Sequence, residues 1–139
     1  MNNKEIIIDN EISGEEFCKI RESVGFQKLS MNQANKILEH TTYISVARYN
    51  GKCIGITRLL FDYCTDAYIT DVIVEPVFQG MGIGKTLVES VLNFIKDNVE
   101  ETHVIVSLYA NRGKETFYEK FGFTKLPSEK YGYGMVLDL

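Results

Sequence analysis

VEPVFQGMGIGK, residues 74–85, joins an apolar strand to the longest periodic segment of the chain. Its glycines permit positive φ and let the backbone approach a ligand closely. The first amides of the helix that follows have no partner inside that helix, and they carry the positive end of its dipole. The stretch therefore predicts a strand–turn–helix junction whose turn binds a phosphate group.

Three phosphate-binding motifs compete for this turn. The P-loop requires a glycine five residues before its Gly-Lys-Ser/Thr end, and Gln79 stands there instead. The dinucleotide fingerprint Gly-x-Gly-x-x-Gly fails too, because its third glycine falls on Lys85 or Leu87. The pattern Gln/Arg-x-x-Gly-x-Gly/Ala fits fully, through Gln79, Gly82 and Gly84. The turn thus argues against a nucleoside triphosphatase and a dinucleotide-binding protein.

Outward from the turn, the hydrophobic pattern predicts an α+β fold. Apolar residues at helical spacing predict a long helix over 83–99, and the apolar run 104–108 predicts a strand after it. Strand, helix and strand in this order form a right-handed parallel crossover. Asn50-Gly51 predicts a tight hairpin. The other expected elements are strands over 6–8, 43–49, 52–61, 67–74, 123–125 and 135–137, and helices starting near 13, 30 and 113.

A second motif, FYEKFGF at residues 117–123, follows the glycine turn. With these two motifs the chain resembles the GNAT superfamily of acetyl-CoA-dependent N-acetyltransferases, most of all its small bacterial single-domain members. The likeness extends over about residues 43–137. It implies one GNAT domain over residues 1–139. Its fold would be a mixed, mostly antiparallel sheet with a central parallel strand–helix–strand crossover and helices on both faces.

The resemblance also implies a site for acetyl-CoA, the co-substrate of these acyltransferases. Backbone amides of the glycine turn would hold the CoA pyrophosphate, and pantetheine would pair with the exposed backbone of Ile73 and Val74. The Val74 amide would stabilise the oxyanion that forms at the thioester carbonyl. The full predicted cofactor-binding set is Ile73, Val74, Gln79, Gly80, Met81, Gly82, Ile83, Gly84, Lys85, Asn111, Phe117 and Tyr118.

Two residues are candidates for the proton transfers of direct acetyl transfer. A phenol of pKa about 10 can protonate a departing thiolate at neutral pH, and the resemblance gives Tyr118 this role. Asp71 is the candidate base or amine orienter, because a carboxylate among apolar strand residues is unusual unless it is paired or functional. Two alternatives stay open for Asp71. It forms a structural pair with Arg58, or a chain of water molecules accepts the proton.

The resemblance implies an acceptor pocket between the N-terminal helices and the loop over 62–66, and its expected lining residues are Arg21, Arg58, Asp62 and Tyr133. We expect the acceptor to be a primary amine of a small molecule, and the two arginines would also suit a carboxylate or phosphate on it. A protein N-terminus or lysine is the alternative acceptor. A non-catalytic acetyl-CoA-binding module is a third interpretation, against which an intact Tyr118 and Asp71 argue.

Charge and composition exclude several other classes of function. The net charge is −4 at pH 7, whereas a nucleic-acid partner usually requires a basic face. No apolar run approaches the roughly 18 residues of a membrane span, and the first residues do not resemble a signal peptide. We therefore expect a cytoplasmic protein that binds neither nucleic acid nor membrane. The family resemblance adds a possible homodimer.

Cysteine and histidine spacing predicts no metal site. The three cysteines, Cys18, Cys53 and Cys64, match neither a paired-CxxC site nor a disulfide framework, so we expect reduced thiols. His40 and His103 lie far apart in the sequence, with no Cys or Glu at ligand spacing.

Overall fold

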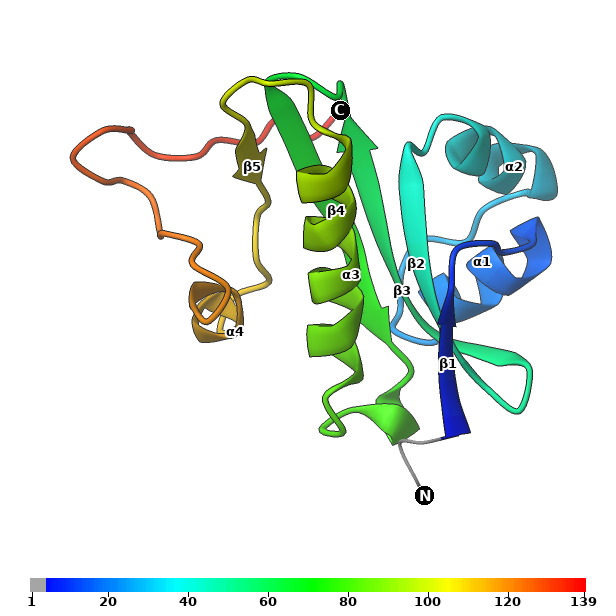
Figure 1. Cartoon of the computed structure of the whole chain (residues 1–139). Helices are drawn as coiled ribbons and strands as arrows, with labels where there is room; N and C mark the ends of the chain where they lie inside the picture. Colours follow the sequence, from blue (N-terminus) through cyan, green and yellow to red (C-terminus); the bar gives the residue numbers. More distant parts are fainter. Residues whose placement is uncertain (1–4) are drawn as a thin grey trace. The chain divides into compact units, whose positions relative to one another are not determined.

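The computed structural model describes residues 5–139. The chain divides into two compact units, one that ends at Ser107 and one over Leu108–Leu139, and each is described by itself. The single domain over residues 1–139 stays a prediction. Figure 1 shows the elements of both units.

A five-stranded sheet forms the centre of the first unit, in the order β1-β2-β3-β4-β5. Neighbouring strands are antiparallel except for β4 and β5, which are parallel. The expected α+β class and the parallel crossover are thereby confirmed. The parallel step lies at one end of this sheet, since β5 is its last strand. The strands are β1 (Ile6–Asp9), β2 (Tyr43–Tyr49), β3 (Lys52–Phe61), β4 (Asp66–Val74) and β5 (Ile105–Ser107).

Helices cover both faces of the sheet (Figure 1). Helices α1 (Gly14–Glu22) and α2 (Met31–Glu39) lie on one face, and α3 (Ile83–Asn98) lies on the other. Both short helices begin with a complete capping box, formed by Ser13 with Glu16 and by Ser30 with Gln33. These boxes satisfy amides that the helices themselves leave unpaired, which explains why both helices start where the sequence predicts.

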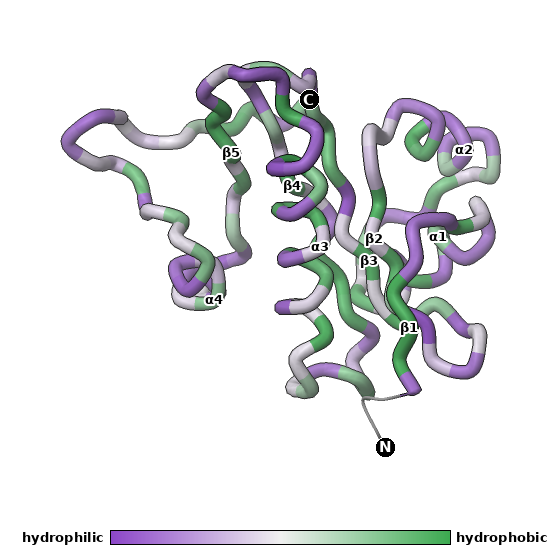
Figure 2. Tube along the Cα trace, in the orientation of Figure 1, coloured by the Kyte–Doolittle hydropathy of each residue, from purple (hydrophilic) through white to green (hydrophobic). Residues whose placement is uncertain are grey.

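Two apolar clusters bury the faces of the sheet. Phe17 and Ile20 of α1 pack with Val46, Ile56 and Ile73 on one side. On the other side the apolar stripe of α3 is buried, with Leu87, Val88 and Val91 fully covered. Figure 2 shows hydrophobic residues along the strands, while α3 alternates between hydrophobic and hydrophilic positions. Each such side chain contributes about 1.5–3 kcal/mol when it is fully buried.

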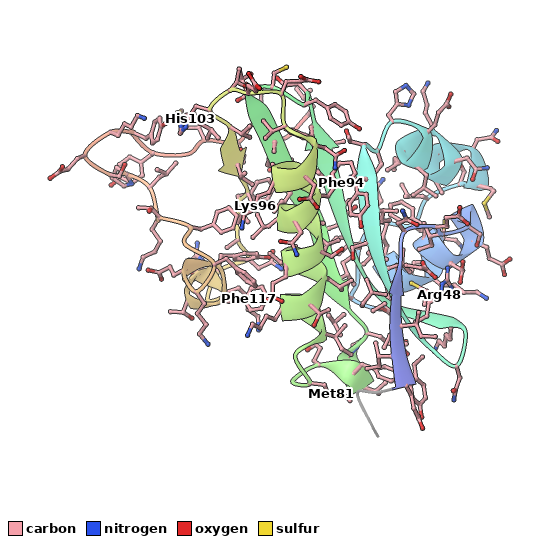
Figure 3. All side chains as sticks on the ribbon, viewed as in Figure 1. Arg48, Met81, Phe94, Lys96, His103 and Phe117 are labelled. Atoms are coloured by element: carbon pink, nitrogen blue, oxygen red, sulfur yellow. The ribbon has the colours of Figure 1, made fainter. Side chains whose placement is uncertain are left out.

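Aromatic stacking fixes α3 against β2. Phe94, labelled in Figure 3, stacks on Tyr43 with ring centroids 4.2 Å apart. The Tyr43 hydroxyl also lies 3.2 Å from Ser90 Oγ. These contacts fix α3 against the sheet, and the glycine turn leads directly into this helix.

Arg48 of β2, also labelled in Figure 3, binds several segments at once. Its guanidinium donates to the carboxylates of Asp9 and Glu16 and to the carbonyls of Glu11 and Gly51. These bonds lower the pKa of Glu16 to about 2 and raise the pKa of Arg48. The edge strand β1, the first turn of α1 and the β2–β3 hairpin thus share one charged partner.

In the second unit, the expected closing strands over 123–125 and 135–137 are not formed. Neither segment pairs with another strand within Leu108–Leu139, and a strand needs a partner for its N–H and C=O groups. Met135, Val136 and Leu137 are 70–91% exposed, so this short apolar run covers no core there. The expected helix near 113 is present as α4 (Glu115–Glu119), which is shorter than predicted.

Candidate functional site

The glycine turn has the backbone conformation that its sequence predicts. After β4 a short 3-10 helix, η2 (Pro76–Phe78), leads into Gly80 and Gly82, both with φ of 81°. Gly82 is the N-cap of α3, and no side chain caps that end. A Cβ at Gly80 or Gly82 would meet no atom within 4 Å, so the space beside both glycines is open.

Open backbone amides follow these glycines at the start of α3. The Thr86 amide donates to Gly82 O at 3.2 Å, which marks the first turn of the helix. The amides of Ile83, Gly84 and Lys85 precede this bond, and a helix leaves its first amides without internal partners. Met81, labelled in Figure 3, lies just before this end of α3. Because the dipole adds positive potential here, this group of amides suits a phosphate.

The end of β4 exposes backbone beside this turn. The Glu75 amide donates to Ile54 O of β3 at 2.8 Å, so the Val74 amide, one residue earlier, points to the opposite edge of β4. On that edge β5 pairs only with Asp66–Tyr68. Among the described residues, no strand pairs with 69–74 on this same edge, while β3 pairs with β4 on the other. Gln79 Nε2 donates to Val74 O at 2.9 Å and ties the glycine turn to this open edge.

Gly55 of β3 permits this close arrangement. It pairs with Val74, and a Cβ on it would lie 3.0 Å from Ile73 O and 3.1 Å from Leu87 Cδ1. A side chain at this position would push β3 away from the end of β4 and from α3. The sequence analysis did not single out Gly55, because its requirement arises from contacts between separate elements.

Asp71 forms an ion cluster with two arginines, called here the arginine–aspartate cluster (Arg21, Arg58, Asp71). Arg21 Nη1 lies 3.1 Å from both carboxylate oxygens, and Arg58 Nε lies 2.7 Å from Oδ2. The three side chains are only 8–14% exposed. Asp71 sits at a register shift between β3 and β4 and has φ of 51°. Such a bulge re-aims a side chain, which explains how Asp71 reaches both arginines.

Aromatic rings and a threonine support the two arginines. The Arg21 guanidinium lies 5.4 Å from the Phe17 centroid and 5.1 Å from the Phe26 centroid. Arg58 Nη1 donates to Thr41 Oγ1 at 3.0 Å. Sequence reasoning missed Thr41 and both rings as part of this group, because residues so far apart in the chain carry no local signal of their contact.

Asp62, a predicted acceptor residue, is bound within its own turn. Its carboxylate accepts the backbone amides of Cys64, Thr65 and Asp66, and the Asp66 amide is the main cause that lowers the Asp62 pKa. These bonds shape the β3–β4 turn. Its role toward an acceptor stays a prediction.

The remaining predicted site residues lie in the second unit. Tyr118 on α4 is enclosed by Phe117 and Phe123, whose ring centroids lie 5.0 and 6.1 Å from its own. Burial raises the pKa of Tyr118. Asn111 accepts the Lys114 amide through its backbone carbonyl, and Tyr133 is 77% exposed.

The described residues 5–139 contain no group of three or more His, Cys, Asp or Glu side chains arranged to hold a metal ion. Within the same range, no helix has both the length and the hydrophobicity that crossing a bilayer requires. The three cysteines are free thiols, and burial raises the pKa of Cys53 to about 11.

Comparisons with known proteins agree on one family, the GNAT acetyltransferases. The model of the Acetyltransferase (GNAT) family matches residues 10–123. An uncharacterized ycf52-like N-acetyltransferase of Prochlorococcus marinus is 33% identical over 116 residues, which cover 81% of this chain and 63% of the relative. The chloroplastic GCN5-related N-acetyltransferase 2 of Arabidopsis thaliana is 36% identical over 76 residues, which cover 55% of this chain and 28% of the relative.

A solved structure supports the fold over nearly the whole chain. The probable acetyltransferase SA2161 of Staphylococcus aureus superposes with a TM-score of 0.83 at 27% identity and covers 96% of this chain and 99% of that one. The chain spans 63% and 64% of the length of the first two curated relatives.

Proposed function

Because the chain belongs to the GNAT acetyltransferase family, we propose that it transfers the acetyl group of acetyl-CoA to a primary amine of a small molecule. The observation that carries this proposal is the glycine turn beside the open end of β4. Open amides, two glycines with positive φ and an unpaired strand edge occur together, linked by the bond from Gln79 to Val74. A protein N-terminus or lysine is the alternative acceptor.

The donor set of the first unit fits CoA. Backbone amides from Met81 to Lys85 would bind the pyrophosphate, with Gln79 and Gly80 beside them. The free edge of β4 at Val74 would pair with the amides and carbonyls of pantetheine, as it would with an added strand. The backbone of Ile73, which was also predicted to pair with pantetheine, faces β3 instead. The predicted cofactor roles of Asn111, Phe117 and Tyr118, which belong to the second unit, rest on the family resemblance. The bound thioester supplies an activated acetyl carbon.

The reaction we propose is direct attack. A neutral amine attacks the acetyl carbon, a C–N bond forms and the C–S bond breaks. The Val74 amide stabilises the oxyanion, and the Tyr118 hydroxyl gives its proton to the leaving thiolate. Burial raises the pKa of Tyr118, so its hydroxyl keeps the proton throughout the neutral range. The nitrogen finally loses a proton to a base.

Water rather than Asp71 is the base that we favour. Both Asp71 oxygens already accept guanidinium N–H groups, and taking a proton would give up part of this pairing. Asp71 then acts as a positioning residue. If Asp71 were the base, Asp71→Asn would nearly abolish kcat for every amine. We expect kcat for neutral amines to be retained.

Release of the CoA thiol across a panel of primary amines tests the proposed activity, and calorimetry measures acetyl-CoA binding separately. Tyr118→Phe should lower kcat about 100-fold near pH 7 and leave acetyl-CoA affinity nearly unchanged, since general acids contribute about 10²–10⁴-fold. Tyr131→Phe, an exposed tyrosine of the same unit, is the matched control. Tight acetyl-CoA binding without thiol release for any amine would favour a non-catalytic module, and no binding would refute the cofactor site.

The compartment we propose is the cytoplasm. Three free thiols fit a reducing environment. The Arabidopsis relative is named as chloroplastic, which is a statement about that protein.

A further inference from the structure

We propose that the arginine–aspartate cluster is an anion subsite, in which Arg21 and Arg58 bind a carboxylate or phosphate carried by the amine acceptor. This inference rests on the proposed acetyl transfer and adds the chemical class of the acceptor to it. It requires that the cluster have spare positive charge, free donors and a location within reach of the open end of β4.

The cluster carries more positive than negative charge. Two guanidinium groups face one carboxylate, which leaves a formal charge of +1. No other carboxylate among the described residues forms an ion pair with Arg21 or Arg58. Side chains that are 86–87% covered lose most of their hydration, so an unbalanced charge there is costly. An oxyanion would balance it.

Each arginine also keeps unused donors. Arg21 uses only Nη1, Arg58 uses Nε and Nη1, and neither Nη2 has a hydrogen-bond partner among the described residues. Arg21 Nε is fully buried without a partner. Guanidinium forks match the paired oxygens of carboxylates and phosphates, so the unused Nη2 groups of two arginines that share Asp71 suit such a group.

The backbone at Asp71 supports a role beyond stability. A non-glycine residue with φ of 51° inside a strand is strained, and strain of this kind concentrates at functional sites. The strained bulge holds the carboxylate between the two arginines. Asp71 thereby fixes the spacing and orientation of both guanidinium groups, as a positioning residue for the subsite.

The position of the cluster limits the size of the acceptor. Asp71 precedes Val74 by three residues in β4, which is about 10 Å along a strand. The amine must reach the thioester beside the Val74 amide while its anionic group lies at the arginines. An acceptor with both groups within about 10 Å is a small molecule, such as an amino acid or an aminoalkyl phosphate.

Two matched pairs of amines test the inference with the full chain and acetyl-CoA. One pair is 3-aminopropanoate and its amide, and the other is 2-aminoethyl phosphate and 2-aminoethanol. We expect kcat/KM to be about tenfold higher for at least one anionic member than for its neutral counterpart, mainly through KM. The pair that shows the preference identifies the anion as carboxylate or phosphate.

Arg21→Gln removes the excess charge. The ratio of kcat/KM between the anionic amine and its neutral counterpart should then fall to a value between about 1 and 2. Comparing ratios between wild type and variant cancels differences in amine basicity. Lys19→Gln removes the same charge from an exposed position of α1 and should keep the wild-type ratio. Arg21→Lys keeps the charge but not the fork, and should give an intermediate ratio even if Arg21→Gln folds poorly.

The outcomes separate this inference from the proposed function. Turnover of neutral amines with no preference for either anionic member would overturn the anion subsite and leave acetyl transfer intact. A preference that survives in Arg21→Lys and Arg21→Gln would also overturn it. If no amine is turned over, acetyl transfer fails, and binding of 3-aminopropanoate and 2-aminoethyl phosphate is measured by calorimetry. Binding weakened by Arg21→Lys then supports the subsite, and absence of binding refutes it.

Discussion

Gly55→Ala tests whether the end of β4 depends on close backbone packing. Gly55 does not have positive φ, so alanine fits its backbone conformation and only the added methyl group matters. That carbon would lie 3.0 Å from Ile73 O, a backbone atom that cannot rotate away. The contact with Leu87 Cδ1 at 3.1 Å is easier to relieve, because this methyl is the tip of a side chain.

Two opposing effects set the magnitude. Overpacking of this kind typically costs 1–3 kcal/mol. Replacing glycine by alanine also restricts the unfolded chain, which stabilises the protein by about 0.4–1 kcal/mol. We therefore expect a net loss of about 1–2 kcal/mol in the free energy of unfolding. For a domain of this size this corresponds to a fall in Tm of roughly 3–8 °C.

Urea unfolding measures this change through the transition midpoint, with an unchanged slope as evidence that only stability is affected. Gly132→Ala is the control, because a Cβ there meets no atom within 4 Å and Gly132 lacks positive φ. Acetyl-CoA affinity, measured by calorimetry, should fall as well, since a shift of Ile73 moves the adjacent Val74, which belongs to the proposed binding edge. A Gly55→Ala protein as stable as wild type would refute the packing argument.

Two further predictions concern the glycine turn and the Arg48 ion pairs. Gly82→Ala places alanine at φ of 81° in open space, so we expect about 1–2 kcal/mol of backbone strain, measured by urea unfolding, and at least tenfold weaker acetyl-CoA binding by calorimetry. The pKa of Glu16 is lowered from 4.5 to about 2 in the folded protein. Its carboxylate therefore stabilises the fold fully above pH about 4.5, and this contribution is lost as the pH falls toward 2. Glu16→Gln should thus lower the urea midpoint at pH 7 more than at pH 3, whereas Glu15→Gln, at an exposed position, should change little at either pH.

Local chemistry explains why so much of the first unit was predictable. The Asn50-Gly51 turn, with φ of 48° and 79°, fixes the hairpin, and both of its strands have the predicted ends. Ser13 and Ser30 start their helices through capping boxes that are visible in the sequence. The glycine turn follows the same rule, because its conformation depends on residues within a few positions of one another.

Features that depend on distant pairing were less predictable. The closing strands over 123–125 and 135–137 were predicted from short local segments, and a local segment does not show which strand would pair with it. The contact between Arg21 and Asp71 joins residues 50 positions apart, so the sequence indicated an unusual acid but not its second arginine. The bulge at Asp71 likewise arises from the pairing of β3 with β4 rather than from a local turn signal.

Arg48 has a consequence for how the first unit opens. All five N–H groups of its guanidinium are engaged, and their partners belong to β1, the segment that leads into α1, α1 itself and the β2–β3 hairpin. The four-residue β1 cannot leave the sheet without losing its bond to the Arg48 guanidinium, which also orients α1 through Glu16. Detachment of the edge strand and fraying of the first helix should therefore be a single cooperative event, with amide protons of both segments exchanging at a common rate.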